Sequence, residues 1–193
     1  MTTRAETPMN FDDAYAFLVE LEGGLLKIDA GEGIQYGGIL QKWLEKDAVG
    51  FPKNILDFTP KDHKDYTQIF YWDKLLEGET WFNIEKKPKN IIRLNSLFQG
   101  VIAPIFFMAF NCGLEDAVRL AQMTSPFLKH DGILGQKTYS FLYSISDPLE
   151  WWKGSEYSDN YMERCSIHYK GQEKEKGLLN RLSKIDAWLR EEV

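Results

Sequence analysis

The sequence predicts a mainly α-helical protein of the α+β class, a helical bundle with one small β-hairpin near the N-terminus. Apolar residues recur at helical spacing through most of the chain, and turn chemistry interrupts that spacing once, within residues 25–38. The length of 193 residues is near that of one ordinary domain. With 44% hydrophobic and 27% charged residues, the composition excludes a disordered or collagen-like chain.

The first predicted helix begins after Asn10, whose side chain can cap it, and ends at Gly23 and Gly24. Glu22 is therefore the last residue before the break. One face of this helix is apolar and is made by Phe11, Ala14, Phe17, Leu18 and Leu21.

A hairpin is expected directly after this helix. Residues 25–28 predict a short strand, 29–33 a turn, and 34–36 the returning strand before Gly37 and Gly38.

The remaining pattern is helical, apart from a polar connection at 77–90 and a tight turn at 131–135. The expected helices cover 39–48, 60–76, 91–111, 114–123, 136–143, 148–152, 157–173 and 177 to the end.

The charge balance of 23 Lys and Arg against 29 Asp and Glu gives a net charge of −6, a poor match for nucleic acid or an anionic membrane. The longest apolar run, 101–110, is about half the length that spans a bilayer, and the N-terminus lacks the apolar stretch of a secretory signal. We expect Cys112 and Cys165 to be buried free thiols in a protein made in a reducing compartment.

The histidines predict no catalytic triad and no metal site. His63, His130 and His168 are scattered, and no pair of His or Cys residues has metal-ligand spacing. His63 lies in the charged run 61–65, which favours a solvated helix face. We expect neither a metal ion nor another cofactor.

Glu22 is the strongest candidate for chemistry. A carboxyl group held partly out of water has a raised pKa and can donate a proton near neutral pH, as glycoside hydrolysis requires. The alternative is a surface residue at a helix end.

A family resemblance favours the first interpretation. Residues 22–24 (Glu-Gly-Gly) and 29–37 (Asp-Ala-Gly-Glu-Gly-Ile-Gln-Tyr-Gly) resemble the opening of glycoside hydrolase family 108, which reads Glu-Gly-Gly-Tyr, a short spacer, then Asp-x-Gly-Gly-x-Thr-x-Tyr-Gly-Ile. Four later segments are similar to motifs of this family and its C-terminal predicted peptidoglycan domain, in the right order: 69–72, 110–122, 131–138 and 177–181.

The resemblance implies a lysozyme-like fold and N-acetylmuramidase activity on bacterial peptidoglycan, with Glu22 as the catalytic acid. Asp29 is the best candidate for a second carboxylate, and its alternative is a turn residue that caps its own backbone. Gln35 and Tyr36 are expected to bind substrate along the cleft, although Tyr36 could equally be a core residue.

The expected organisation is a catalytic segment at 1–90 and a helical peptidoglycan-binding segment at 91–193, packed on it as one compact unit. The expected partners are peptidoglycan glycan strands, with no nucleic acid and no membrane insertion, and the protein is expected to be a monomer. It would be made in the cytoplasm and would act on the cell wall after release by a separate export or lysis system, as an endolysin does.

The second function class is a non-catalytic peptidoglycan-binding or structural protein of a phage particle or secretion device. Departures from the family pattern favour this alternative. These are Ile34 at the family's Thr position and a spacer before Asp29 that is about two residues shorter than usual, whereas retention of Glu22, Gly23 and Gly24 disfavours the alternative.

Overall fold

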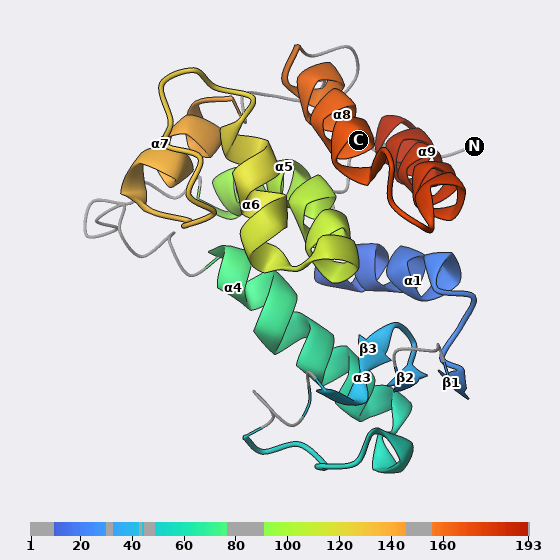
Figure 1. Cartoon of the computed structure of the whole chain (residues 1–193). Helices are drawn as coiled ribbons and strands as arrows, with labels where there is room; N and C mark the ends of the chain where they lie inside the picture. The colour runs from blue at the N-terminus through green and yellow to red at the C-terminus, as the bar shows by residue number, and fades with distance from the viewer. Residues whose placement is uncertain are drawn as a thin grey trace, which may run out of the picture. The chain divides into compact units, whose positions relative to one another are not determined.

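The computed structural model describes residues 10–29, 33–42, 44, 49–76, 91–145 and 156–192. These residues form a mainly helical protein with one small antiparallel sheet near the N-terminus, which confirms the predicted fold class (Figure 1). The chain divides into two compact units: the N-terminal unit is Phe11–Lys74, and the C-terminal unit contains Leu75–Val193 together with Met1–Asn10. The predicted boundary at residue 90 lies outside the described residues, and the packing of two segments as one unit stays a prediction.

The N-terminal unit surrounds the small sheet with short helices. In chain order its elements are α1 (Phe11–Leu21), β1 (Lys27–Asp29), β2 (Ile34–Tyr36), β3 (Ile39–Leu40), the 3-10 helix η2 (Ile55–Asp57), α3 (Pro60–Thr67) and the π-helical η3 (Gln68–Trp72). The short helix α4 (Asp73–Leu76) continues η3 and contains the division between the units, so the predicted helix at 60–76 is confirmed as a helical run with a π segment inside it.

The sheet has the strand order β1-β2-β3, and both neighbouring pairs are antiparallel. The expected hairpin is therefore present but carries a third strand. Residues 39–40 were expected to begin a helix, and that expectation is wrong. Gly37 and Gly38 adopt φ values of +53° and +90°, which reverse the chain and pair Ile39 with Tyr36.

α3 begins with a capping box, in which Thr59 and Asp62 exchange side-chain and backbone hydrogen bonds. Its inner face is formed by His63, Tyr66 and Thr67, which recur at helical spacing and are buried. The expectation of a solvated His63 is therefore wrong: its side chain is 0% exposed, because only its charged neighbours in the run face outward.

The C-terminal unit contains five described helices, and the apolar half of α5 lies in its core. The helices are α5 (Ile91–Cys112), α6 (Leu114–Gln122), α7 (Gln136–Ser144), α8 (Glu156–Tyr169) and α9 (Glu175–Glu192). Residues 101–110 of α5 are all buried, and α5 packs against α6, α7 and α9. No helix among the described residues is long and apolar enough to cross a membrane. The helix expected at 148–152 lies outside the described residues.

Both cysteines are free thiols. Cys165 is buried as expected, whereas Cys112 is only partly buried. Burial nevertheless raises the pKa of the Cys112 thiol to about 12, so it stays protonated at neutral pH.

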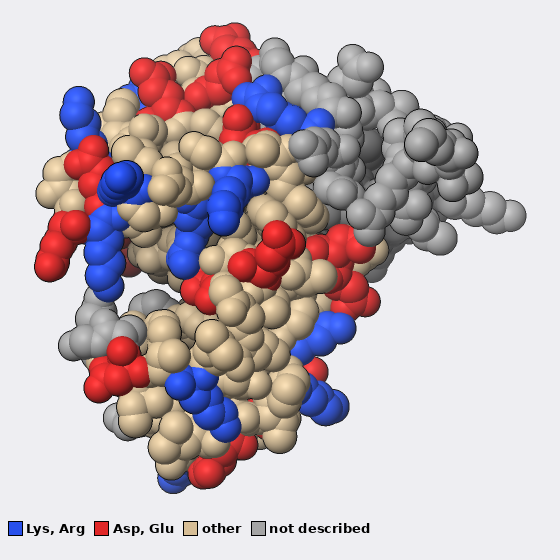
Figure 2. Space-filling view, turned by 90° about the vertical axis from the view of Figure 1, so that its right-hand side faces the viewer, with Lys and Arg blue, Asp and Glu red and all other residues tan. Residues whose placement is uncertain are grey.

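On the face shown in Figure 2, acidic and basic side chains are interspersed over the described residues. The described residues form surface ion pairs, such as Lys61 with Asp65 and Lys64 with Asp12. Exposed pairs of this kind contribute little to stability.

Candidate active site

Glu22 directly follows α1, and the helix is ended by the two glycines that come next. The Gly23 N–H donates to the Glu20 carbonyl over 3.0 Å, and the Gly24 N–H donates to the Val19 carbonyl over 2.8 Å. These two bonds, with Gly23 at a φ of +76°, form a Schellman motif. The predicted end of the first helix is confirmed, and the following chain turns toward β1.

The position of Glu22 on α1 explains its partial burial. Glu22 follows Leu18 by one helical turn, and Leu18 is 2% exposed. Glu22 thus continues the buried face of the helix at its C-terminal end. Glu22 itself is half-buried. A carboxyl group at such a border can meet a substrate while staying partly shielded from water.

Asp29 is the last residue of β1 and is exposed. Its cross-strand partner on β2 is Ile34, whose side chain is 39% exposed. Directly opposite residues in antiparallel strands have neighbouring side chains, so an aliphatic group lies beside the Asp29 carboxylate. The turn that Asp29 was expected to begin includes residues 30–32, which lie outside the described residues.

Gln35 and Tyr36 lie on opposite faces of the sheet, because successive residues of a strand alternate. Tyr36 shares its face with Lys27 and Asp29, whereas Gln35 shares the other face with Ile28. The structure therefore places Asp29 and Tyr36 on one face and separates Gln35 from them. Tyr36 is 4% exposed, which favours the core role that the sequence left open.

His63 forms a buried polar link that sequence reasoning missed. Its Nε2 lies 3.0 Å from the Gly37 carbonyl oxygen, and its Nδ1 lies 2.9 Å from the Tyr15 hydroxyl. A carbonyl can only accept, so Nε2 carries the proton and Nδ1 accepts from the Tyr15 O–H. The Tyr36 ring packs edge-on against the imidazole, with 5.5 Å between ring centroids.

Burial sets the protonation states of this link. It lowers the pKa of His63 to about 4, against a smaller opposing effect of the bond to Gly37, so the imidazole is neutral at pH 7. Burial also raises the pKa of Tyr15 to about 12, and the pKa of Tyr36 is raised for the same main reason. Both phenols therefore remain neutral at pH 7. The sequence signal for His63 was its helical spacing with Tyr66, which the charged run around it obscured.

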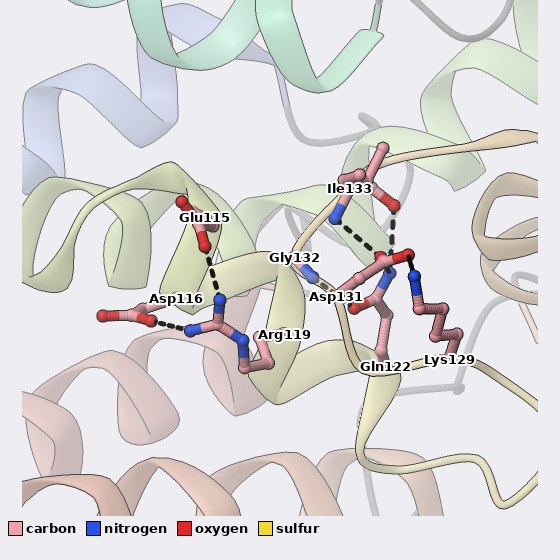
Figure 3. A network of polar contacts seen from close by, with 8 residues as sticks. All are labelled: Glu115, Asp116, Arg119, Gln122, Lys129, Asp131, Gly132 and Ile133. Atoms are coloured by element: carbon pink, nitrogen blue, oxygen red, sulfur yellow. Dashed lines mark hydrogen bonds and ion pairs between the residues drawn. The ribbon is translucent and has the colours of Figure 1, made fainter.

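A second polar network lies in the C-terminal unit around Gln122, whose residue is 1% exposed (Figure 3). Its Oε1 accepts from the Gly132 N–H over 2.8 Å, and its Nε2 lies within 3.1 Å of oxygens on Asp131, Ile133 and Thr138. The backbone N–H of Ile133 and the Gln122 amide lower the pKa of Asp131. This network holds the predicted turn at 131–135 against α6 and leads the chain into α7.

Gly132 shows why this turn needs its glycine. Its φ is +73°, and an added Cβ would lie 2.7 Å from the Glu115 carbonyl oxygen. The polar groups of the turn are engaged with one another, so the motif at 131–138 builds structure. Among the residues that the structure describes, no cluster of three His, Cys, Asp or Glu side chains could hold a metal ion.

Two other family-like motifs meet in the C-terminal unit. The Arg181 guanidinium donates to the Asn111 side-chain oxygen, and the Asn111 amide donates to the Phe107 carbonyl over 3.1 Å. The contact joins α9 to the end of α5 across 70 positions of sequence. Segments 110–113 and 177–181 therefore act together in holding these helices.

These observations define a mainly helical protein whose first helix ends in a half-buried glutamate and is followed by a three-stranded sheet. No protein-family model and no curated protein sequence matches the chain. The fold is similar to that of the solved structure of Brucella abortus SagA, with a TM-score of 0.65 and 19% sequence identity over 93% of this chain and 92% of that chain. At this identity the similarity concerns the fold.

Proposed function

We propose that the protein is a peptidoglycan hydrolase of the N-acetylmuramidase type, related to glycoside hydrolase family 108, in which Glu22 is the general acid. The observation that carries the proposal is the placement of Glu22, half-buried at the glycine-terminated end of α1. The sheet that follows directly carries a second carboxylate, Asp29, in the same unit. A motif of the resemblance also forms a defined structural element: the turn at 131–135 is held by a hydrogen bond from the Gly132 N–H to the Gln122 side chain.

In the proposed reaction, Glu22 protonates the oxygen of the β-1,4 bond between N-acetylmuramic acid and N-acetylglucosamine. Asp29 is exposed at the end of β1, and we propose that its carboxylate activates a water molecule. Gln35 lies on the opposite face of the sheet from Asp29, so in this proposal it would contact a sugar unit away from that carboxylate, and Tyr36 supports the sheet from inside. No step requires a cofactor.

The alternative is a non-catalytic protein that binds peptidoglycan or serves as a structural part of a phage particle or secretion device. One observation favours it. Ile34, at the Thr position of the family pattern, lies directly across from Asp29, so a hydroxyl that could hydrogen-bond that carboxylate is replaced by an aliphatic group.

Product analysis separates the two functions. Purified peptidoglycan is incubated with the protein, and the soluble fragments are reduced and identified by mass spectrometry. A muramidase releases fragments with reducing N-acetylmuramic acid ends. Sedimentation of the protein with the insoluble wall, without any release of fragments, would support the non-catalytic alternative.

A further inference from the structure

The buried link at His63 connects the two elements that carry the proposed site. Tyr15 lies on α1, seven positions before Glu22, which is about two helical turns or roughly 10 Å along the axis. Positions seven apart lie on nearly the same side of a helix. A hydrogen bond that fixes Tyr15 therefore also fixes the rotation of α1 at its Glu22 end.

The other end of the link fixes the sheet. Gly37 follows β2, and its N–H donates to the Leu26 carbonyl over 3.2 Å, just before β1 begins. Its carbonyl accepts from His63. Gly37 has a φ of +53°, and an added Cβ would lie 2.7 Å from His63 Nε2 and 2.8 Å from Leu25 Cδ2. The sheet is thus held against the imidazole with no room for a side chain at this position.

We infer that His63 is a positioning residue for the reaction assigned to Glu22: through Tyr15 it fixes α1, and through Gly37 it fixes the sheet that carries Asp29 and Gln35. This inference rests on the proposed function. His63 acts through these neighbours and touches no substrate, since its side chain is 0% exposed.

A Tyr15 hydroxyl that donates to His63 requires a neutral imidazole, because a protonated ring donates from both nitrogens and Tyr15 would then have to accept. The groups around it come from three elements. Asp12 and Tyr15 lie on α1, Lys27 and Tyr36 on the sheet, and Asp62, Lys64 and Asp65 on α3. The Lys64 ammonium is 5.8 Å from the centroid of the Tyr15 ring, and the Lys27 ammonium is 5.2 Å from that of Tyr36. Burial lowers the pKa of His63, and the bond to the Gly37 carbonyl opposes that shift.

The test is Tyr15→Phe, which removes the hydroxyl and keeps the ring. Without that donor the neutral imidazole loses a partner, so its protonation becomes easier and the acidic limb of the pH–rate profile should move to higher pH. We expect kcat for peptidoglycan solubilisation to fall about tenfold at neutral pH with KM changed less than about threefold, since α1 is misplaced and binding contacts remain.

Tyr139→Phe is the matched control. It removes a buried tyrosine hydroxyl that donates to the Leu75 carbonyl in the C-terminal unit, remote in sequence from His63. We expect this control to lose stability while its pH–rate profile stays that of the wild type.

Three outcomes would overturn the inference. Wild-type kcat and pH profile in Tyr15→Phe would show that the link positions nothing. Equal losses of kcat in both variants would show that general destabilisation is the cause. A wild type that releases no fragments at any pH would reject the hydrolase itself and this role with it, whereas the first two outcomes leave the hydrolase intact.

Discussion

Protonation of His63 should destabilise the protein in a defined pH window. Burial lowers the pKa of His63 from 6.5 to about 4 in the folded state, while the unfolded chain keeps the ordinary value. Between these values the unfolded state binds more protons, so the free energy of unfolding rises with pH. This contribution is fully present above pH 6.5 and is lost as the pH falls to about 4.

The size of this effect follows from the two pKa values. Each pKa unit corresponds to about 1.4 kcal/mol, so the difference between 6.5 and about 4 corresponds to about 3 kcal/mol. Against a typical stability of about 5–15 kcal/mol, a loss of this size is easily measured.

The assay is urea unfolding at about pH 7, 5.5 and 4, with the wild type, His63→Gln and, as a control, His130→Gln at an exposed position. His63→Gln is expected to be less stable at pH 7, but its disadvantage should shrink by about 3 kcal/mol toward pH 4, because glutamine does not titrate. His130→Gln should follow the wild type. A disadvantage of His63→Gln that is the same at every pH would refute the reasoning.

Two further variants test the packing around each polar network. Gly37→Ala should lower the free energy of unfolding by about 3 kcal/mol, because a left-handed backbone penalty is added to a clash with His63. The control is Gly50→Ala, at a position that also has a positive φ but where an added Cβ meets no atom within 4 Å; it should cost about 1–2 kcal/mol. Equal losses for the two variants in thermal or urea unfolding would contradict the clash. Gln122→Glu should cost about 3 kcal/mol at neutral pH although the side chain keeps its size, because a donor facing the Asp131 carboxylate and two other oxygens becomes an acceptor. Gln136→Glu at the exposed start of α7 is the control, and similar unfolding curves for the two variants would refute the role of the amide.

Local chemistry predicted the elements whose signals lie in adjacent residues. The end of α1 could be predicted from the sequence because Gly23 and Gly24 supply the positive φ values of its cap. β2 could be predicted because glycines that favour turns flank three residues of strand character. The strand at 39–40 was missed because a short apolar run suits either helix or strand, and its pairing with β2 is a tertiary contact.

The candidate site was predictable only in part. Glu22 and Asp29 are candidates that a sequence pattern suggested, whereas the separation of Gln35 from Asp29 depends on strand register. The role of His63 could not be predicted because its partner Tyr15 is 48 positions away. A charged run normally indicates a solvated face, and here helical periodicity turns one residue of that run inward.

Comparison of Glu22→Gln with Glu20→Gln tests the central claim most directly. Both replace a carboxyl group by an amide near the end of α1, but Glu20 is exposed and Glu22 is half-buried. The measurement is the initial rate of peptidoglycan solubilisation, with thermal unfolding recorded for each variant to verify folding. Glu22→Gln should unfold like the wild type and lose at least about 100-fold in rate, because an amide cannot donate the proton, while Glu20→Gln should keep the wild-type rate. A folded Glu22→Gln that keeps about half of the wild-type rate would remove Glu22 from the mechanism and contradict the account.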